Sequence, residues 1–401
     1  MKVVIADKME AFIVDRLRAM GAAVEVNAAL EGETLADACA DAHVLIVRSK
    51  KVPAPVFARA RKLAVVIRAG AGVNTIDVEA ASAHGVFVAN CPGKNAIAVA
   101  ELAMGLLIAL DRHIPDNVAA LRAGRWEKAK FSEATGLAGR TLGVAGFGDI
   151  GRELAVRARA FGMSVLAWSR SLTAEAAAEA GVTRVDSAQA LFEGADVVSL
   201  HLPLTAQTRH LVGADLLGRM KAGAILLNTA RSEVCDEVAL LDAVKTRGLR
   251  VGLDVLNGEP AGKAAEWRHP LADAPGVYIT HHIGASTEQA QNAVAEEVLR
   301  IVSAYASTGE VPNCVNLCAR SPATHQMVIR HEDRVGVLAS VLGAVSRHHF
   351  NVEEMENIIF DGAKAACCFV RVSHEPTAAL VAELEALPSV LGVGVATLRH
   401  D

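Results

Sequence analysis

Short apolar runs alternate with helical patterns over roughly the first ninety residues of the chain. The runs lie at residues 3–6, 44–47, 63–67 and 86–89, and stretches with helical periodicity separate them. Alternation at this spacing predicts βα units, whose strands form a parallel sheet.

A second βα series follows a long helical pattern. That pattern covers residues 95–124 and is apolar on more than one face, which indicates burial against another domain or another subunit. Further apolar runs come after it, at residues 142–145, 165–168, 197–200, 225–227, 251–255 and 277–280. Six strands with intervening helices are what a dinucleotide-binding sheet requires.

The last part of the chain has a different pattern. Residues 304–324 are polar and include Pro312 and Pro322, as in a linker. Beyond them, strands are predicted at residues 327–331, 350–359, 365–373 and 390–398, and helices at 336–347 and 376–386. The resulting order, β-α-β-β-α-β, predicts a small ferredoxin-like α+β module.

These patterns predict an α/β protein with two doubly wound parallel-sheet domains and a C-terminal α+β module. A chain of 401 residues is long enough for two or three domains. The predicted boundaries are 1–94 and 283–310 for a substrate-binding domain, 95–282 for a Rossmann-type dinucleotide-binding domain, 311–325 for the linker and 326–401 for the module.

Composition narrows the class of partner. The formal net charge is -5 and no basic stripe is visible, which argues against a nucleic-acid partner. Met1 leads directly into a strand-like run, and no apolar run approaches the roughly 18 residues of a membrane span. Seven cysteines without a framework indicate reduced thiols, and Cys314 and Cys318 lack a second ligand pair. We therefore expect a cytoplasmic protein with no membrane partner and no metal site.

The segment GVAGFGDIG holds a glycine-rich phosphate loop. It closes one apolar run and opens a helical pattern, the context in which a GxGxxG sequence is informative. Gly146 permits the tight turn, Gly148 lets a pyrophosphate approach the backbone, and Gly151 lets the helix pack on the strand. The free amides of the helix N-terminus then face the phosphates.

The choice between NAD and NADP depends on the end of the next strand. An acidic residue about 20 positions after the loop would bond the ribose 2′-hydroxyl of NAD. This chain has Ser169 and Arg170 there. Serine does not repel a 2′-phosphate and arginine can pair with one, so the sequence permits NADP as well as NAD.

Three polar residues that follow predicted strands suit hydride transfer between an alcohol and a ketone. The fork of Arg231 can hold a carboxylate and the reacting oxygen. His282 can move the proton, and Glu259 beside it would raise the pKa of the imidazole and fix its tautomer. Ligands bind at the carboxyl ends of parallel strands, where these residues are expected. His281 is the competing candidate for the acid/base.

The order of these motifs resembles that of the D-isomer-specific 2-hydroxyacid dehydrogenase family. The matching stretches are GVAGFGDIG, SLHLPLTAQTRHLV, LLNTARSEVCDE, GLDVLNGEP and THHIGAST, which lie within about residues 1–310. The resemblance implies that Arg231, Glu259 and His282 are catalytic. It also implies a nicotinamide-dependent oxidoreductase whose cofactor cleft includes Asp149, Ile150, Leu202, Thr229, Ala230, Asp254, Gly284 and Ala285. The chain departs from the family pattern at His281, where proline is usual, and at Ser169, where aspartate is usual.

Residues of the first domain are candidates for binding the substrate. Successive amides of Ala71, Gly72 and Val73 can cradle a carboxylate. Arg48, Arg68 and Lys94 add positive charge, and a phosphorylated acid needs several cations where lactate or glyoxylate needs few.

The C-terminal module resembles an ACT regulatory domain, with the signature HEDRVGVL followed by FNV. The resemblance implies that His331 and Asn351 are effector positions. Asp333 replaces an asparagine of relatives that bind serine and would repel the carboxylate of an amino acid. A dimerisation role for the module is therefore the alternative to feedback control.

Three functions remain open on the sequence alone. The whole chain is similar to the branch of the family that oxidises 3-phosphoglycerate with NAD(P) at the entry to serine biosynthesis. The second hypothesis keeps this chemistry with hydroxypyruvate or glyoxylate as substrate, and the third is a non-catalytic, nucleotide-sensing scaffold. The apolar helix at 95–124 favours a homo-oligomer, either a dimer or a tetramer.

Overall fold

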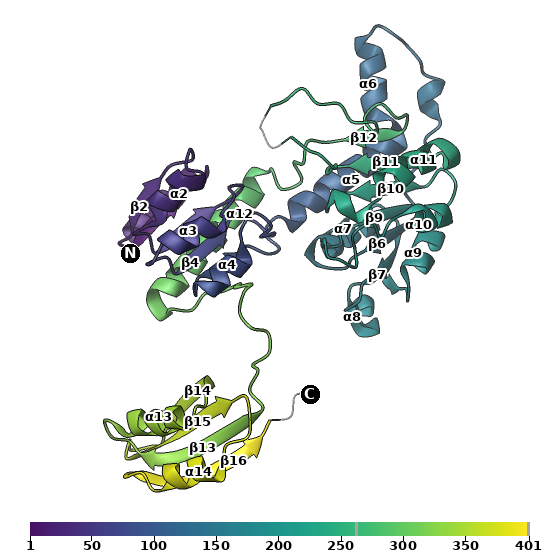
Figure 1. Ribbon diagram of the computed structural model, residues 1–401. Coiled ribbons are helices and arrows are strands. Elements are labelled where there is room, and N and C mark those ends of the chain that lie inside the picture. The colour runs from purple at the N-terminus through teal and green to yellow at the C-terminus, as the bar shows by residue number, and fades with distance from the viewer. Residues whose placement is uncertain (261–263, 399–401) are drawn as a thin grey trace. The chain divides into compact units, whose positions relative to one another are not determined.

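The computed structural model describes residues 1–260 and 264–398. The chain divides into two compact units, Met1–Asn316 and Leu317–Asp401 (Figure 1). Residues 261–263 of the predicted dinucleotide-binding domain and 399–401 of the predicted module lie outside the described residues.

The first sheet of the larger unit has five parallel strands in the order β2-β1-β3-β4-β5. Its strands are β1 (Lys2–Ile5), β2 (Ala23–Val26), β3 (Val44–Val47), β4 (Val65–Arg68) and β5 (Phe87–Asn90). The connecting helices are α1 (Ala11–Ala19), α2 (Gly32–Cys39), α3 (Ala54–Arg59) and α4 (Val78–Ala83). Strand β2 was not predicted, because this edge strand is only half-buried and carries Glu25 in place of a continuous apolar run.

A helix from far along the chain completes this first domain. Helix α12 (Glu288–Thr308) packs its buried face, including Val298 and Ile301, against Ile5 and Ile67 of the first sheet. Residues 313–316 then lie against β5, where the Val315 amide donates to the carbonyl of Val88. The first residues of the predicted linker therefore belong to the larger unit, which ends at Asn316.

The second sheet has seven parallel strands in the order β12-β11-β10-β9-β6-β7-β8. They are β6 (Thr141–Ala145), β7 (Ser164–Trp168), β8 (Thr183–Arg184), β9 (Val197–Leu200), β10 (Ile225–Asn228), β11 (Arg250–Leu253) and β12 (Val277–Ile279). Its helices include α7 (Asp149–Ala160), α8 (Ala174–Glu179), α9 (Ala188–Gly194), α10 (Ala214–Arg219) and α11 (Glu237–Arg247), with short 3-10 turns η1 (Lys130–Ser132) and η2 (Ser232–Val234). The strand order reverses between β6 and β9, the kind of position where doubly wound sheets bind ligands.

The single helix predicted at residues 95–124 is wrong. The segment forms α5 (Ala96–Arg112) and α6 (Ile114–Arg122), separated by His113, whose φ is 50°. Pro115 causes the break, because proline has no N–H to continue the hydrogen bonds of α5 and its ring clashes with the preceding turn of a helix. It lies instead in the first turn of α6, where proline is tolerated. Helix α5 is buried against its own sheet, where Leu107 and Leu110 join the core around Leu142. Across the two described ranges, no helix has the length and apolar character needed to cross a membrane.

The smaller unit confirms the predicted β-α-β-β-α-β module. Its antiparallel sheet has the order β14-β15-β13-β16, formed by β13 (His325–Glu332), β14 (Val352–Ile359), β15 (Ala365–Val372) and β16 (Val390–Thr397). Helices α13 (Val337–Arg347) and α14 (Ala378–Glu385) contribute Val341, Val345 and Leu380 to a core with Ile329 and Val370 of the sheet.

Candidate active site

The carboxyl ends of five neighbouring strands in the second sheet carry the candidate residues. The pairing of β6, β9, β10, β11 and β12 keeps these ends level with one another. The first residues beyond the strands are therefore Gly146, His201, Thr229, Asp254 and Thr280, in that order across the sheet. The predicted phosphate loop and the predicted catalytic loops share this edge.

The glycines of the phosphate loop have different surroundings. Gly146 has a φ of 97°, and a Cβ there would lie 2.5 Å from the carbonyl oxygen of His201. A Cβ on Gly151 would lie 2.4 Å from the carbonyl oxygen of Gly146. Gly148, which precedes α7, faces open space. Two glycines thus permit close packing, and the third leaves room for a phosphate beside the free amides of the helix.

Other candidate cofactor residues border the same edge. The side chain of Leu202 lies over Gly146, and the carboxylate of Asp149 lies close to Gly93. Thr229 is buried, and its Oγ1 has no hydrogen-bond partner among the described residues. A buried hydroxyl without a partner is costly unless a ligand satisfies it. This donor and the open space at Gly148 fit a bound dinucleotide.

Further candidate positions flank this edge. Ser169 follows β7 and is half-buried, whereas Arg170 is exposed. Ile150 is half-buried in the first turn of α7, and Ala230 is buried after β10. Gly284 packs against Val99 of α5. The cofactor candidates therefore extend along the edge from β7 to β12.

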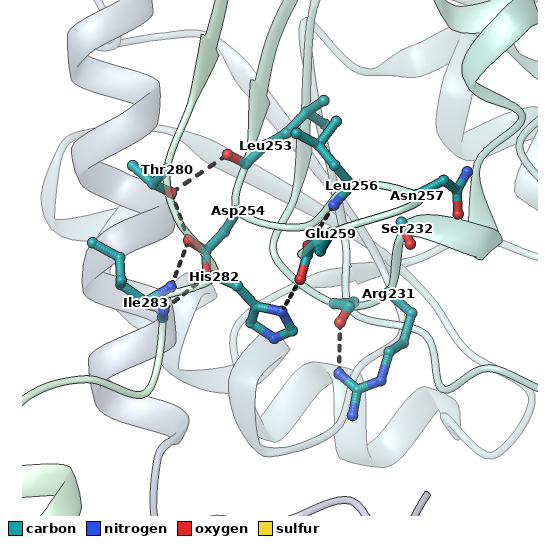
Figure 2. A network of polar contacts seen from close by, with 12 residues as sticks. Arg231, Ser232, Leu253, Asp254, Leu256, Asn257, Glu259, Thr280, His282 and Ile283 are labelled. Carbon is teal, nitrogen blue, oxygen red and sulfur yellow. Dashed lines mark hydrogen bonds and ion pairs between the residues drawn. The ribbon is translucent and has the colours of Figure 1, made fainter. Parts of the chain in front are cut away.

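His282 and Glu259 form the central pair of the site (Figure 2). The Nδ1 of His282 lies 2.8 Å from Oε2 of Glu259. The other oxygen of Glu259 accepts a hydrogen bond of 2.7 Å from the amide of Leu256. Because Nδ1 faces the carboxylate, Nε2 of the half-exposed imidazole is left for a ligand.

Asp254 fixes the loop that carries His282. Its buried carboxylate accepts from the Thr280 hydroxyl at 2.6 Å, the Ile283 amide at 2.9 Å and the Gly284 amide at 2.7 Å. These bonds lie on both sides of His282, which has a φ of 53°. They hold the histidine in a backbone conformation that is uncommon outside glycine. The competing candidate, His281, is exposed.

Arg231 is held by a turn at the end of β10. The Asn228 side chain accepts from the Ala230 amide at 3.0 Å and donates to the Arg231 carbonyl at 2.9 Å. The guanidinium of Arg231 donates to the carbonyl of Ala230 at 2.6 Å. This contact occupies one nitrogen of the fork, so other donors remain for an anion.

The three predicted catalytic residues line one cavity of about 380 Å³. Arg68 and Ser49 of the first domain line the same cavity. An adjoining cavity of about 200 Å³ shares Ser49, Arg68 and His282 and adds Arg48 and Ala285. The structure therefore brings the imidazole–carboxylate pair together with three arginines from two sheets.

Positive charge is concentrated on the first-domain side of these cavities. Burial lowers the pKa of Arg68, and the neighbouring charges of Arg231 and Arg48 lower it further. The Nε of Arg68 is buried and has no hydrogen-bond partner among the described residues. A Cβ on Gly72 would lie 2.9 Å from Arg231, so the glycine makes room for this guanidinium. Unpaired, partly desolvated arginines are typical of a site for carboxylate or phosphate.

Other predicted substrate residues lie elsewhere. Lys94 forms an ion pair of 3.2 Å with Glu297 and is not among the described residues that line the two cavities. The carbonyl of Ala71 accepts from the Asn90 side chain at 2.6 Å. Val73 packs against the first-domain core, and Gly72 is the member of the predicted cradle that contacts a cavity-lining side chain.

The two effector candidates have different surroundings in the C-terminal module. His331 is buried and bonded to the Glu332 carbonyl at 2.8 Å and to Asn357 at 3.1 Å. Asn351 is exposed and donates to Glu353 at 3.1 Å. Residues 1–260 and 264–398 contain no group of three or more metal-ligating side chains.

Asp7 and Ser49 were not predicted as site residues. Buried Asp7 accepts from the amides of Arg48 at 2.6 Å, Ser49 at 2.9 Å and Lys50 at 3.1 Å. Burial opposes the charge of Asp7, but these bonds hold its pKa below the ordinary value. Asp7 follows β1, so the carboxyl-end rule applied to the second sheet would also have identified it.

His201 was also missed. Its Nε2 lies 2.9 Å from the hydroxyl of Ser199, and its Nδ1 is buried without a partner among the described residues. Burial lowers the pKa of His201 to about 4, so this imidazole is neutral near neutral pH. His201 lies in the stretch SLHLPLTAQTRHLV, but nothing in that sequence indicates that its side chain is buried.

Comparisons with known proteins agree with this geometry. Residues 104–284 match the NAD-binding domain of D-isomer-specific 2-hydroxyacid dehydrogenases, and residues 325–389 match the ACT domain. The chain is 41% identical to D-3-phosphoglycerate dehydrogenase of Methanocaldococcus jannaschii over 75% of its own length and 57% of that protein. It is 42% identical to hydroxypyruvate reductase of Thermotoga maritima over 67% of its own length and 87% of that protein.

A solved structure has the same fold over most of the chain. The TT0316 protein of Thermus thermophilus superposes with a TM-score of 0.70 and 35% identity, over 79% of this chain and 100% of that one. The chain spans less than two thirds of the archaeal phosphoglycerate dehydrogenases that it matches, 57% of the Methanocaldococcus protein and 66% of the Archaeoglobus fulgidus protein. The relatives and the fold agree, and the chain belongs to the D-isomer-specific 2-hydroxyacid dehydrogenase family.

Proposed function

We propose that this chain oxidises D-3-phosphoglycerate to 3-phosphohydroxypyruvate with a nicotinamide cofactor, the first step of L-serine biosynthesis. The observation that carries the proposal is the shared cavity, which His282, Glu259, Arg68 and Arg231 all line. An imidazole–carboxylate pair supplies acid/base chemistry, and the two arginines supply sites for an acid with more than one negative group.

His282 is the proposed acid/base. Its Nε2 takes the proton of the C2 hydroxyl as the carbonyl forms, and the negative charge of Glu259 stabilises the resulting imidazolium. Arg231 holds the substrate carboxylate and polarises the C2 oxygen. In the reverse direction the same imidazolium returns its proton to the oxygen.

The cofactor would lie along the carboxyl edge of the second sheet. Gly146, Gly148 and Gly151 would hold the pyrophosphate at α7, and Thr229 and Asp254 would hold the nicotinamide end. When bound, the oxidised nicotinamide accepts the hydride that leaves C2. Ser169 and exposed Arg170 extend the proposal to NADP, because neither side chain repels a 2′-phosphate.

Arg48 and Arg68 are the proposed ligands of the phosphate group. Both line the smaller cavity beside His282, and repulsion between neighbouring guanidinium groups falls when an anion binds between them. Lys94 is not included, because Glu297 already pairs its charge.

A second candidate function is reduction of hydroxypyruvate or glyoxylate. The similarity to the Thermotoga maritima reductase favours it. Initial rates with 3-phosphoglycerate, 3-phosphohydroxypyruvate, hydroxypyruvate and glyoxylate, each with NAD(H) and NADP(H), separate the two. A kcat/KM for the reduction of 3-phosphohydroxypyruvate below the values for hydroxypyruvate and glyoxylate would reject the first proposal.

We also propose a homodimer formed through α6. Its apolar side chains Ile114, Val118 and Leu121 are exposed, and Trp126 just beyond it is 79% exposed. A monomer rarely leaves such a group of side chains in water. Light scattering on the protein and on a Leu121→Glu, Trp126→Glu variant tests this, and an unchanged mass would reject α6 as the interface.

A further inference from the structure

We propose that Glu237 is a positioning residue that ties the segment of Arg231 to the loop of Glu259. This inference rests on the proposed function, because it concerns how two of the proposed catalytic side chains keep their relative position. Glu237 is not among the described residues that line the two cavities, so it would act only through the loops that it joins.

Glu237 uses both of its carboxylate oxygens. Its Oε1 accepts a hydrogen bond of 2.8 Å from the backbone amide of Asn257, and its Oε2 lies 3.2 Å from Nε2 of His269. The side chains of Glu237 and His269 are only 15% and 13% exposed. A largely buried carboxylate whose two oxygens both accept hydrogen bonds has little freedom to move, so the contact is rigid.

On one side, Glu237 is continuous with the segment of Arg231. The turn η2 follows Arg231 directly and leads through Cys235 and Asp236 into α11, whose first residue is Glu237. The Val212 amide donates to the carbonyl of Val234, and the Asp236 amide donates to the carbonyl of Val212. These bonds fix the short segment, so Arg231 and Glu237 belong to one rigid piece.

On the other side, Asn257 belongs to the loop that presents Glu259. The neighbouring Leu256 amide binds one oxygen of Glu259, whose other oxygen meets His282. Ser232 and Asn257 line the same cavity as Glu259 and His282, and Figure 2 labels all four residues. The carboxylate of Glu237 therefore joins the segment that carries Arg231 to the loop that carries Glu259.

The role of Glu237 differs from that of the residue before it. Asp236 caps α11, accepting from the Val238 amide at 3.0 Å and the Ala239 amide at 3.2 Å. Asp236 therefore supports the helix, whereas Glu237 reaches outward to the other loop. Because the two acids are adjacent on one helix, Asp236 supplies a matched control for any loss of helix stability.

The test compares three variants with the intact enzyme. Glu237→Ala should lower kcat about tenfold and change KM less than about threefold, because a misplaced Glu259 slows proton transfer and leaves the arginines in place. Glu237→Gln should recover part of kcat, since its amide oxygen still accepts from Asn257, whereas its NH2 group cannot accept from Nε2 of His269. Asp236→Ala should lower the melting temperature and leave kcat within about twofold. Equal losses of kcat in Glu237→Ala and Asp236→Ala, or no recovery with Gln, would overturn the proposal.

Hydrogen exchange provides a readout that needs no substrate. In Glu237→Ala, the amides of Leu256 and Asn257 should exchange at least about tenfold faster than in the wild type, and Asp236→Ala should leave them unchanged. If these two amides exchange at the wild-type rate in Glu237→Ala, Glu237 does not hold the loop of Glu259 in place. An inactive wild type whose exchange still responds as expected would contradict the proposed function instead.

Discussion

The two parallel sheets of the larger unit carry opposite kinds of chemistry at their carboxyl ends. The first sheet presents guanidinium groups, Arg48 after β3 and Arg68 at the end of β4, to the cavities. The second sheet presents the carboxylate of Glu259 and the imidazole of His282, with Arg231 beside them. Both edges follow the same rule of parallel sheets, in which ligands bind where the strands end.

The carboxyl ends of the two sheets differ in which side chains they present, and this indicates that they have different roles. The first sheet uses Asp7 to hold the backbone of Arg48 and Ser49, so its own acid binds the loop and forms no ion pair with the arginine side chains. The Arg48 guanidinium donates one long hydrogen bond of 3.4 Å to Gln291, and its other donors remain for a ligand. The second sheet uses Asp254 in the same way, but the loop it holds carries His282, the proposed acid/base. We infer that the first edge selects the substrate and the second performs the reaction.

The largest expected effect belongs to the second edge. His282→Ala should lower kcat at least about a hundredfold, because the variant lacks the imidazole that would take the proton of the C2 hydroxyl. Cofactor affinity, measured by fluorescence titration, should stay within about threefold of the wild-type value. Turnover close to that of the wild type would mean that the imidazole is not the acid/base.

A smaller effect is expected at the first edge. Arg68→Ala should raise KM for 3-phosphoglycerate about thirtyfold and KM for hydroxypyruvate only a few-fold, since the charge would contact the phosphate. Arg16→Ala, at an exposed ion pair with Glu296, is the control and should leave both values unchanged. Equal increases for the two substrates would place the phosphate elsewhere.

Cofactor preference tests the far end of the second edge. Ser169→Asp should raise the ratio of kcat/KM with NAD to that with NADP about tenfold, because a carboxylate bonds the ribose hydroxyl and repels a 2′-phosphate. Glu179→Gln, at an exposed position at the end of α8, is a control that changes the charge of the same domain at a different position. An unaltered ratio in Ser169→Asp would show that the position does not meet the ribose.

The smallest effect on catalysis is expected for Glu297, whose substitution should change the stability of the fold. Bonds from Arg300, then from Asn313 and Lys94, lower the pKa of buried Glu297 to about 2. Glu297→Gln should therefore lower the free energy of unfolding by about 2 kcal/mol near neutral pH. The ordinary pKa is higher than the folded one, so this stabilisation is complete above about pH 4.5 and is lost as the pH falls toward 2.

Denaturant titrations at about pH 7 and pH 3.5 measure this change. The difference in free energy of unfolding between the wild type and Glu297→Gln should be smaller at the lower pH. A difference that widens on acidification would contradict the assignment of the buried charge to Glu297.

Much of the fold was predictable because continuous apolar runs mark buried strands. All four runs before residue 90 and all six after residue 140 became strands. The strands β2 and β8 were missed because both lie at sheet edges and lack such a run, and both residues of β8 are exposed. The break between α5 and α6 was signalled by Pro115, but the apolar pattern on both sides concealed it.

The candidate site was partly predictable from position alone. Arg231, Glu259 and His282 each follow a predicted strand, and the structure brings them to one cavity. Lys94 has the positive charge expected of a substrate ligand and lies in the first domain. However, Glu297 of α12, which comes much later in the chain, forms an ion pair with it. The tie through Glu237 also depends on tertiary contacts, because no local pattern links α11 with the loop at Asn257.

A crystal structure of the ternary complex with the nicotinamide cofactor and 3-phosphoglycerate tests the central claim most directly. The account predicts the C2 hydroxyl within about 3 Å of Nε2 of His282, the carboxylate on Arg231 and phosphate oxygens on Arg48 or Arg68. A substrate whose C2 lies away from His282, or whose phosphate contacts none of the first-sheet arginines, would contradict it.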